Sequence, residues 1–104
     1  MTVGDFGEAL CAMHRRRGWE YLYRQLAEEC CELGKAALKM VRVANGETPD
    51  SANAVAENYV EELADVWLMI AIARTDLSQE EKEQFDRIVE EKYSRLMERM
   101  GAKT

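Results

Sequence analysis

Proline occurs once among the 104 residues, at Pro49, and it divides the chain into two long stretches. Because proline removes a backbone donor and breaks helices, the stretches on either side are free to be helical. Apolar residues in both stretches recur at helical spacing, and no segment has the strict alternation of a β-strand. The sequence therefore predicts an all-α fold.

Further breaks divide the chain into four expected helices. The breaks are Gly18, Asn45-Gly46, Thr48-Pro49 and Leu77-Ser78. The expected helices span about residues 4–16, 20–44, 55–75 and 79–99. Asn45-Gly46 is expected to end the second helix, because a residue that takes positive φ commonly follows a helix end. Thr48-Pro49 is a candidate start of the third helix, and Ser78-Gln79-Glu80-Glu81 has the pattern of a capping box.

The length and charge of the chain limit its class. At 104 residues it is expected to be one domain, residues 1–104. Its 14 Lys and Arg residues against 20 Asp and Glu residues give a net charge of −6, which argues against nucleic-acid partners and anionic membranes. The longest apolar stretch, around Val66–Ala73, is too short to span a bilayer.

The cysteines and the N-terminus favour a cytoplasmic protein. The chain has 3 cysteines, an odd number, and Cys30 and Cys31 are neighbours that do not readily bridge on a helix. The N-terminus has no basic segment followed by an apolar run, so no signal peptide is expected. A reduced, cytoplasmic protein accounts for both features.

Three acids share one strip of the second expected helix. At about 100° per residue, Glu32 lies about 40° and Glu29 about 100° from Glu28. The apolar arc of the same helix contains Leu22, Leu26, Leu33, Ala37 and Met40. Glu29 therefore falls at the edge of the core-facing arc, with Glu28 and Glu32 beside it.

The third expected helix carries Glu61, Glu62 and Asp65 within an apolar face. Their angular neighbours are Val66, Met69, Ile72 and Ala73. Leu63 and Trp67 make the opposite side of the helix apolar too. A helix that is apolar nearly all round is usually buried, often by a partner subunit as well as by its own chain, so a homodimer or dimer of dimers is expected.

Ordinary surface ion pairs are the alternative explanation for these acids, and the spacing disfavours it. A basic residue four positions after a glutamate stabilises a helix, but none follows these acids at that spacing. Arg24 and Lys35 could compensate in part on the second helix. Carboxylates beside a core are costly unless they are protonated or bind a cation.

A divalent metal would balance this charge. An all-oxygen site suits Mg²⁺ or Mn²⁺. His14 is the only histidine, which excludes a di-iron site built on paired Glu-x-x-His motifs. Because Mg²⁺ held by protein carboxylates usually takes phosphates as further ligands, the acids predict a nucleotide substrate.

Two acidic motifs, Glu28-Glu29-x-x-Glu32 and Glu62-x-x-Asp65, resemble the EExxE and ExxD signature of the MazG-like nucleoside triphosphate pyrophosphohydrolases. The resemblance covers about residues 17–100 and includes Lys92-x-x-Arg95-x-x-x-Arg99, which is similar to the basic end of the family's last helix. It implies a four-helix MazG-like domain that forms intersubunit helix bundles, as a homodimer or tetramer. It also implies that a nucleoside triphosphate is cut between its α and β phosphates, giving the monophosphate and pyrophosphate.

The resemblance further implies roles for individual residues. The Mg²⁺ ligands that it implies are Glu29, Glu32, Glu62 and Asp65. Glu28 is an additional acid that orients water or joins a second metal, and Glu28 and Glu29 are the expected catalytic carboxylates. Glu61 is an alternative ligand in a Glu-x-x-x-Asp pairing, although Glu62 lies deeper in the apolar face.

The separation of the two motifs departs from the family. The 29 residues from position 33 to position 61 are slightly more than the family usually has between them. The excess falls in the region 44–56 and predicts a longer loop there.

Four cations are candidates for contacting substrate phosphates. Lys39 lies two turns beyond Glu32 on the same strip, and a solvated lysine is an equally good interpretation of it. Lys92, Arg95 and Arg99 lie close together on the fourth expected helix, so they repel one another unless an anion lies among them.

Aromatic residues precede the first acidic motif. Trp19, Tyr21 and Tyr23 could stack on a base or serve as core or subunit contacts, and contacts are favoured for two of the three. His14 is expected at the surface and has no assigned role.

These features predict a Mg²⁺-dependent pyrophosphohydrolase that acts on an NTP or dNTP. A non-catalytic nucleotide-binding or regulatory helical module on the same scaffold is the alternative. All five motif acids are present, which favours the enzyme.

Overall fold

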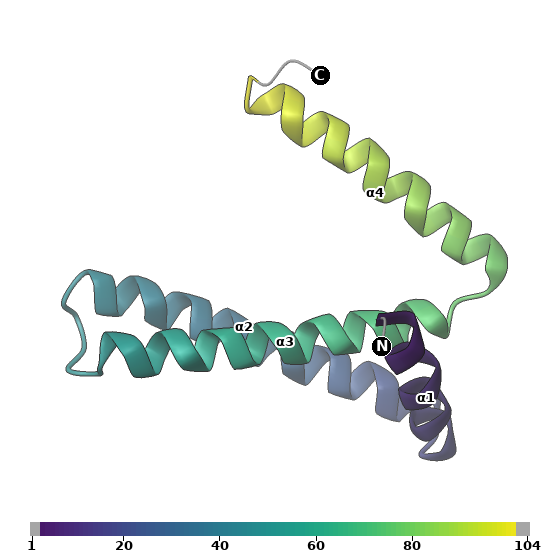
Figure 1. The fold of residues 1–104 in the computed structure, drawn as a ribbon, viewed down its shortest axis with the longest axis horizontal. Helices are drawn as coiled ribbons and strands as arrows, with labels where there is room; N and C mark the ends of the chain where they lie inside the picture. Colours follow the sequence, from purple (N-terminus) through teal and green to yellow (C-terminus); the bar gives the residue numbers. More distant parts are fainter. Residues whose placement is uncertain (1–2, 102–104) are drawn as a thin grey trace.

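The computed structural model describes residues 3–101, and this part of the chain consists of four α-helices without a strand. The helices are α1 (Val3–Arg16), α2 (Trp19–Ala44), α3 (Ala52–Thr75) and α4 (Gln79–Arg99) (Figure 1). The predicted all-α class is confirmed. Residues 1, 2 and 102–104 of the expected domain lie outside the described residues.

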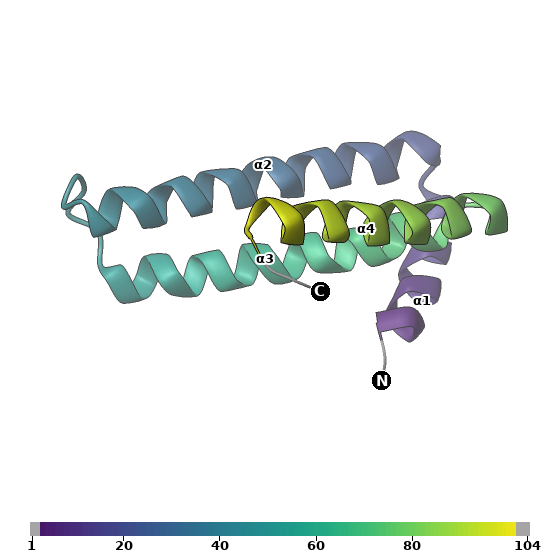
Figure 2. The same ribbon diagram turned by 90° about the horizontal axis from the view of Figure 1, so that it is seen from above.

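The long helices α2 and α3 run antiparallel, side by side, and α1 packs across both at one end of the pair (Figures 1 and 2). The core lies at this junction and contains Cys11, Leu22, Met69 and Ile72, with Leu10 and Leu26 packed against it. Figure 1 shows α4 turning away from the pair, and none of its residues is buried. None of the described helices combines the length and the apolar character of a membrane-spanning segment.

Local signals explain most helix ends. Gly46 takes φ of 70° directly after the cap of α2, as predicted for a helix stop. The capping box at the start of α4 is also confirmed. The backbone N–H of Ser78 donates to the Glu81 carboxylate at 2.9 Å, and the N–H of Glu81 donates to the Ser78 hydroxyl at 3.1 Å.

The predicted start of α3 at Thr48-Pro49 is wrong. The Thr48 hydroxyl donates to the Asp50 carboxylate at 2.7 Å, so it is engaged within the loop. Ser51 caps the helix instead, accepting from the N–H of Ala54 at 3.4 Å. Because α2 ends at Ala44 and α3 begins at Ala52, the loop is shorter than the expected region 44–56, and residues 52–56 belong to α3.

Two glycines within helices are predicted to respond oppositely to alanine. At Gly7, where α1 crosses α3, an added Cβ would lie 2.6 Å from the Thr75 hydroxyl oxygen and 3.2 Å from the Ala71 carbonyl oxygen. At Gly34 of α2 an added Cβ would meet no atom within 4 Å. Thermal unfolding should show Gly7→Ala destabilised by about 1–3 kcal/mol by overpacking and Gly34→Ala stabilised by about 0.5–1 kcal/mol. A stabilised Gly7→Ala would contradict this packing of α1 on α3.

Candidate metal centre

Three carboxylates meet between α2 and α3. Glu29 comes from α2, and Glu62 and Asp65 stand one turn apart on α3. One carboxylate oxygen from each lies within 4.8 Å of the other two. Glu29 and Glu62 are half-buried, and Asp65 is exposed. The structure thus brings together three of the four predicted Mg²⁺ ligands.

Glu29 and Glu62 occupy core positions in the seam between the helices. On α2, the buried residues Leu22 and Ala36 lie seven positions before and after Glu29. On α3, the buried residues Val55 and Met69 lie seven positions before and after Glu62. A spacing of seven keeps residues on one face of a packed helix. The two acids therefore stand where the pattern on either side places apolar side chains.

The buried arc of α2 is turned further toward Glu29 than predicted. Ala37 was expected in the core, but it is exposed, and its neighbour Ala36 is buried. Because successive helical residues differ in direction by about 100°, this difference moves Glu29 from the edge of the arc to its middle.

The charges within this cluster oppose one another. Burial raises the pKa of the Glu29 carboxyl above its ordinary value of 4.5, and the nearby charges of Asp65 and Glu62 raise it further, followed by those of Glu28 and Glu32. Among the described residues, none of the three clustered acids forms an ion pair. The cluster is therefore a set of converging oxygen donors without a neutralising cation from the chain.

The raised pKa of Glu29 predicts a pH-dependent effect of Glu29→Gln in metal-free buffer. At neutral pH the folded protein bears the cost of ionised Glu29, so the variant should unfold at a higher temperature than the parent. The difference in melting temperature between variant and parent should shrink as pH falls through the raised pKa of Glu29 in the folded protein, because the folded parent then binds a proton at Glu29. The change should be complete near pH 4.5, where Glu29 of the unfolded chain binds a proton too. Melting curves over this range measure it, with Glu57→Gln as an exposed control. An advantage that is constant with pH would contradict the proposed repulsion.

The other acids of the motifs lie outside the cluster. Glu32 is exposed and pairs with Lys35 at 3.4 Å, as the sequence allowed in part. Glu28 is exposed and accepts from the Gln25 amide at 3.4 Å. Glu61 is exposed beside Glu62 and does not join the three carboxylates, which favours Glu62 as the ligand.

The predicted phosphate contacts are not assembled at the cluster within one chain. Lys39 pairs with Asp50 at 3.3 Å and ties α2 to the following loop. The pKa of the Asp50 carboxyl is lowered, first by the Thr48 hydroxyl and then by Lys39. Lys92, Arg95 and Arg99 lie on α4, which diverges from the α2–α3 pair (Figure 1).

A pocket of about 230 Å³ extends from the acids toward α1. Glu29 and Asp65 line it together with Tyr21 and Gln25 of α2 and apolar residues of α3. His14 of α1 also lines this pocket and is half-buried, so it has polar and apolar neighbours that were not predicted from the sequence. His14 follows the core residue Leu10 by four positions, a spacing that indicates the inner face of α1.

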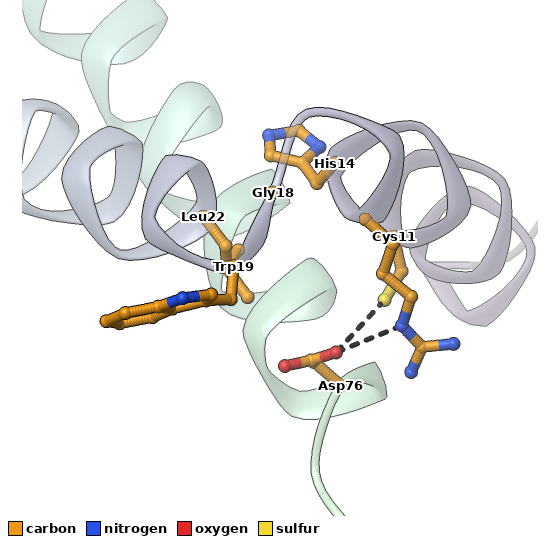
Figure 3. A pocket seen from close by; sticks show the side chains of 7 residues that line it. Cys11, His14, Gly18, Trp19, Leu22 and Asp76 are labelled. Atoms are coloured by element: carbon orange, nitrogen blue, oxygen red, sulfur yellow. Dashed lines mark hydrogen bonds and ion pairs between the residues drawn. The ribbon is translucent and has the colours of Figure 1, made fainter.

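A second pocket, of about 150 Å³, lies where α1 meets the end of α3 (Figure 3). There the Asp76 carboxylate accepts from Arg15 Nε at 3.1 Å and from the Cys11 thiol at 3.8 Å. Burial raises the pKa of the Cys11 thiol. These contacts hold α1 on α3 beside the turn that leads to α4. Cys11 is buried, whereas Cys30 and Cys31 are exposed.

Comparison of the chain with family models, with curated proteins and with solved structures found no match.

Proposed function

We propose that the protein is a Mg²⁺-dependent nucleoside triphosphate pyrophosphohydrolase that cleaves between the α and β phosphates of an NTP or dNTP. The observation that supports this most strongly is the cluster of Glu29, Glu62 and Asp65, in which Glu29 and Glu62 occupy core positions of the α2–α3 seam. Unneutralised acids at such positions oppose folding, so a bound cation explains why the chain places them there.

The donor set of the cluster fits the proposed metal. All three donors are carboxylate oxygens, which suit Mg²⁺ or Mn²⁺, and the exposure of Asp65 leaves one side open to a phosphate. When bound, the metal neutralises phosphate charge and lowers the pKa of water. Glu28 lies on the adjoining strip of α2 and accepts a proton from the attacking water. Glu32 would be the fourth ligand if its carboxylate left the 3.4 Å contact with Lys35.

We also propose that the site is completed in a homodimer or tetramer. On α3, an open apolar groove of about 680 Å³ is lined by Val60, Leu63, Ala64, Trp67 and Leu68. On α4, the exposed apolar side chains include Phe85, Ile88, Val89 and Leu96, and exposed Met100 directly follows the helix. Two such faces cover each other when α4 of one subunit packs on α3 of its partner.

The groove and the carboxylate cluster lie on opposite sides of α3, because Leu63 and Trp67 point away from Glu62 and Asp65. Contact of Lys92, Arg95 and Arg99 of α4 with the substrate phosphates therefore needs a second subunit contact, as a tetramer would supply. We place the protein in the cytoplasm, where nucleoside triphosphates occur and thiols stay reduced.

The test is pyrophosphate release from a panel of NTPs and dNTPs, with Mg²⁺ and with EDTA. We expect Mg²⁺-dependent release of pyrophosphate and the nucleoside monophosphate from at least one nucleotide. Release of phosphate instead of pyrophosphate, or equal release in EDTA, would contradict the proposal.

One observation favours the alternative, a nucleotide-binding or regulatory module. Glu32 pairs with Lys35 and leaves the predicted ligand set with three assembled members. Saturable, Mg²⁺-dependent binding of nucleotides without any turnover in the same panel would favour the module over the enzyme.

A further inference from the structure

We propose that His14 and Gln25 select the nucleobase of the substrate, in the pocket that runs from the carboxylate cluster to α1. This inference rests on the proposed function, because it takes the ligand to be a nucleotide whose phosphates lie at the cluster. It assigns base selection to two residues outside the acidic motifs.

The pocket has the direction and the length that a nucleotide needs. Tyr21, Gln25 and Glu29 follow one another at four-residue steps, so they line one face of α2. The helical rise from Tyr21 to Glu29 is about 12 Å, comparable to the extent of a nucleoside with its first phosphate. With that phosphate at Glu29 and Asp65, the base lies near His14, Tyr21 and Gln25.

The walls of the pocket suit a base. Leu10 of α1 and Leu68, Met69 and Ile72 of α3 supply apolar surface. Ligand pockets of this kind combine apolar walls with a few polar groups that determine orientation. Beyond the acids, the polar groups here are the His14 imidazole, the Gln25 amide and the Tyr21 hydroxyl.

His14 is held in one orientation and one tautomer. Its Nδ1 lies 2.8 Å from the carbonyl oxygen of Leu10, and a carbonyl can only accept, so Nδ1 carries the proton. In the neutral ring Nε2 is then an acceptor, which selects a base that presents an N–H group there. The Gln25 amide offers both donors and an acceptor, and its bond to Glu28 is long, at 3.4 Å.

Tyr21 is the aromatic residue placed to contact the base. Its ring lies 5.1 Å from the His14 ring, and its hydroxyl accepts from Arg17 at 2.9 Å, which holds the ring in position. Trp19 and Tyr23 pack edge to face on each other, and neither lines this pocket. Of the three aromatic candidates in the sequence, Tyr21 is the one that lines the pocket shared with Glu29 and Asp65.

The experiment compares base preference in the parent, His14→Leu, Gln25→Leu and the control Gln79→Leu. Gln79 is exposed at the start of α4, and its substitution makes the same chemical change away from the pocket. Two readouts are needed: kcat/KM for the panel of NTPs and dNTPs, and calorimetric binding of non-hydrolysable α,β-methylene nucleotides with Mg²⁺. Preference is the ratio between the best and the worst base.

We expect the preference to fall by about tenfold or more in His14→Leu and in Gln25→Leu, and to stay unchanged in Gln79→Leu. If no protein turns over any nucleotide but the pocket variants lose base preference in analogue binding, the base-selecting role of the pocket is supported and only the enzymatic function is refuted. Turnover with an unchanged preference in both pocket variants overturns the pocket and leaves the proposed function standing. Failure of the parent to bind any analogue overturns both. Circular dichroism and the Mg²⁺-induced rise in melting temperature verify that each variant folds with its metal site.

Discussion

Glu62→Gln is expected to lower Mg²⁺-dependent pyrophosphate release by about a hundredfold or more, whereas Glu61→Gln leaves it within about threefold. Loss of groups that merely support a metal ligand already costs about 10–100-fold, and Glu62 is proposed as a ligand itself. The pair is matched because the two residues are adjacent glutamates on α3 that undergo the same substitution. They differ in position, since Glu62 is half-buried in the cluster and Glu61 is exposed outside it.

Steady-state kinetics at saturating Mg²⁺ measures this prediction, with melting curves to show that both variants fold. A large loss of turnover in Glu61→Gln, with normal turnover in Glu62→Gln, would show that Glu61 is the ligand, in the Glu-x-x-x-Asp pairing with Asp65. If both variants were as active as the parent, turnover would not depend on the carboxylate cluster, and the proposed site would be wrong.

Trp67→Glu is expected to weaken self-association by about thirtyfold or more in Kd. Trp67 lines the apolar groove on α3 with 58% of its surface exposed in the single chain. Aromatic residues at the centre of an interface commonly contribute about 2 kcal/mol or more, and a charge placed there must also be desolvated. Trp19→Glu is the control, because Trp19 is 74% exposed and lies outside that groove.

Sedimentation velocity over a range of concentrations measures the association of parent and variants. Turnover measured over the same concentrations shows whether activity depends on association: if the assembled protein is needed, turnover of Trp67→Glu falls in parallel with its dissociation. A parent that remains monomeric at the highest concentration would refute the interface. Dissociation with full retention of turnover would show that each chain forms its site alone.

The helices could be predicted from the sequence where their ends depend on local groups. The capping box at Ser78 and the glycine after α2 involve residues close together in the chain, and both predicted ends are confirmed. The start of α3 was missed because two hydroxyls compete there. Thr48 bonds to Asp50 and leaves the cap to Ser51, a choice that depends on the conformation of the loop.

The carboxylate cluster was predictable in part for a similar reason. Glu62 and Asp65 share a helix, and the apolar pattern around Glu29 on α2 indicated the same seam. Glu32 lies outside the cluster and pairs with Lys35, three residues further along α2. This ion pair is an alternative to binding a metal together with the other three acids. The sequence offered both partners and contained nothing that decided between them.

Features that depend on the angle between helices were not predictable. His14 lines the pocket because α1 crosses the α2–α3 pair at that point. The periodicity of a single helix shows which face is buried, but it does not show where another helix crosses it. The direction of α4 was not predictable either. The sequence places its apolar and basic residues on one helix, but it does not show that this helix turns away from the α2–α3 pair (Figure 1).

Thermal unfolding with and without Mg²⁺ tests whether Glu29, Glu62 and Asp65 hold a divalent cation. A ligand at 100 times its Kd stabilises the folded state by about 2.7 kcal/mol, which corresponds to a rise of roughly 10 °C or more in Tm for a chain of this size. We predict this rise in the parent and in Glu61→Gln, and its loss in Glu62→Gln. An unchanged Tm of the parent, or an equal rise in Glu62→Gln, would contradict the metal centre.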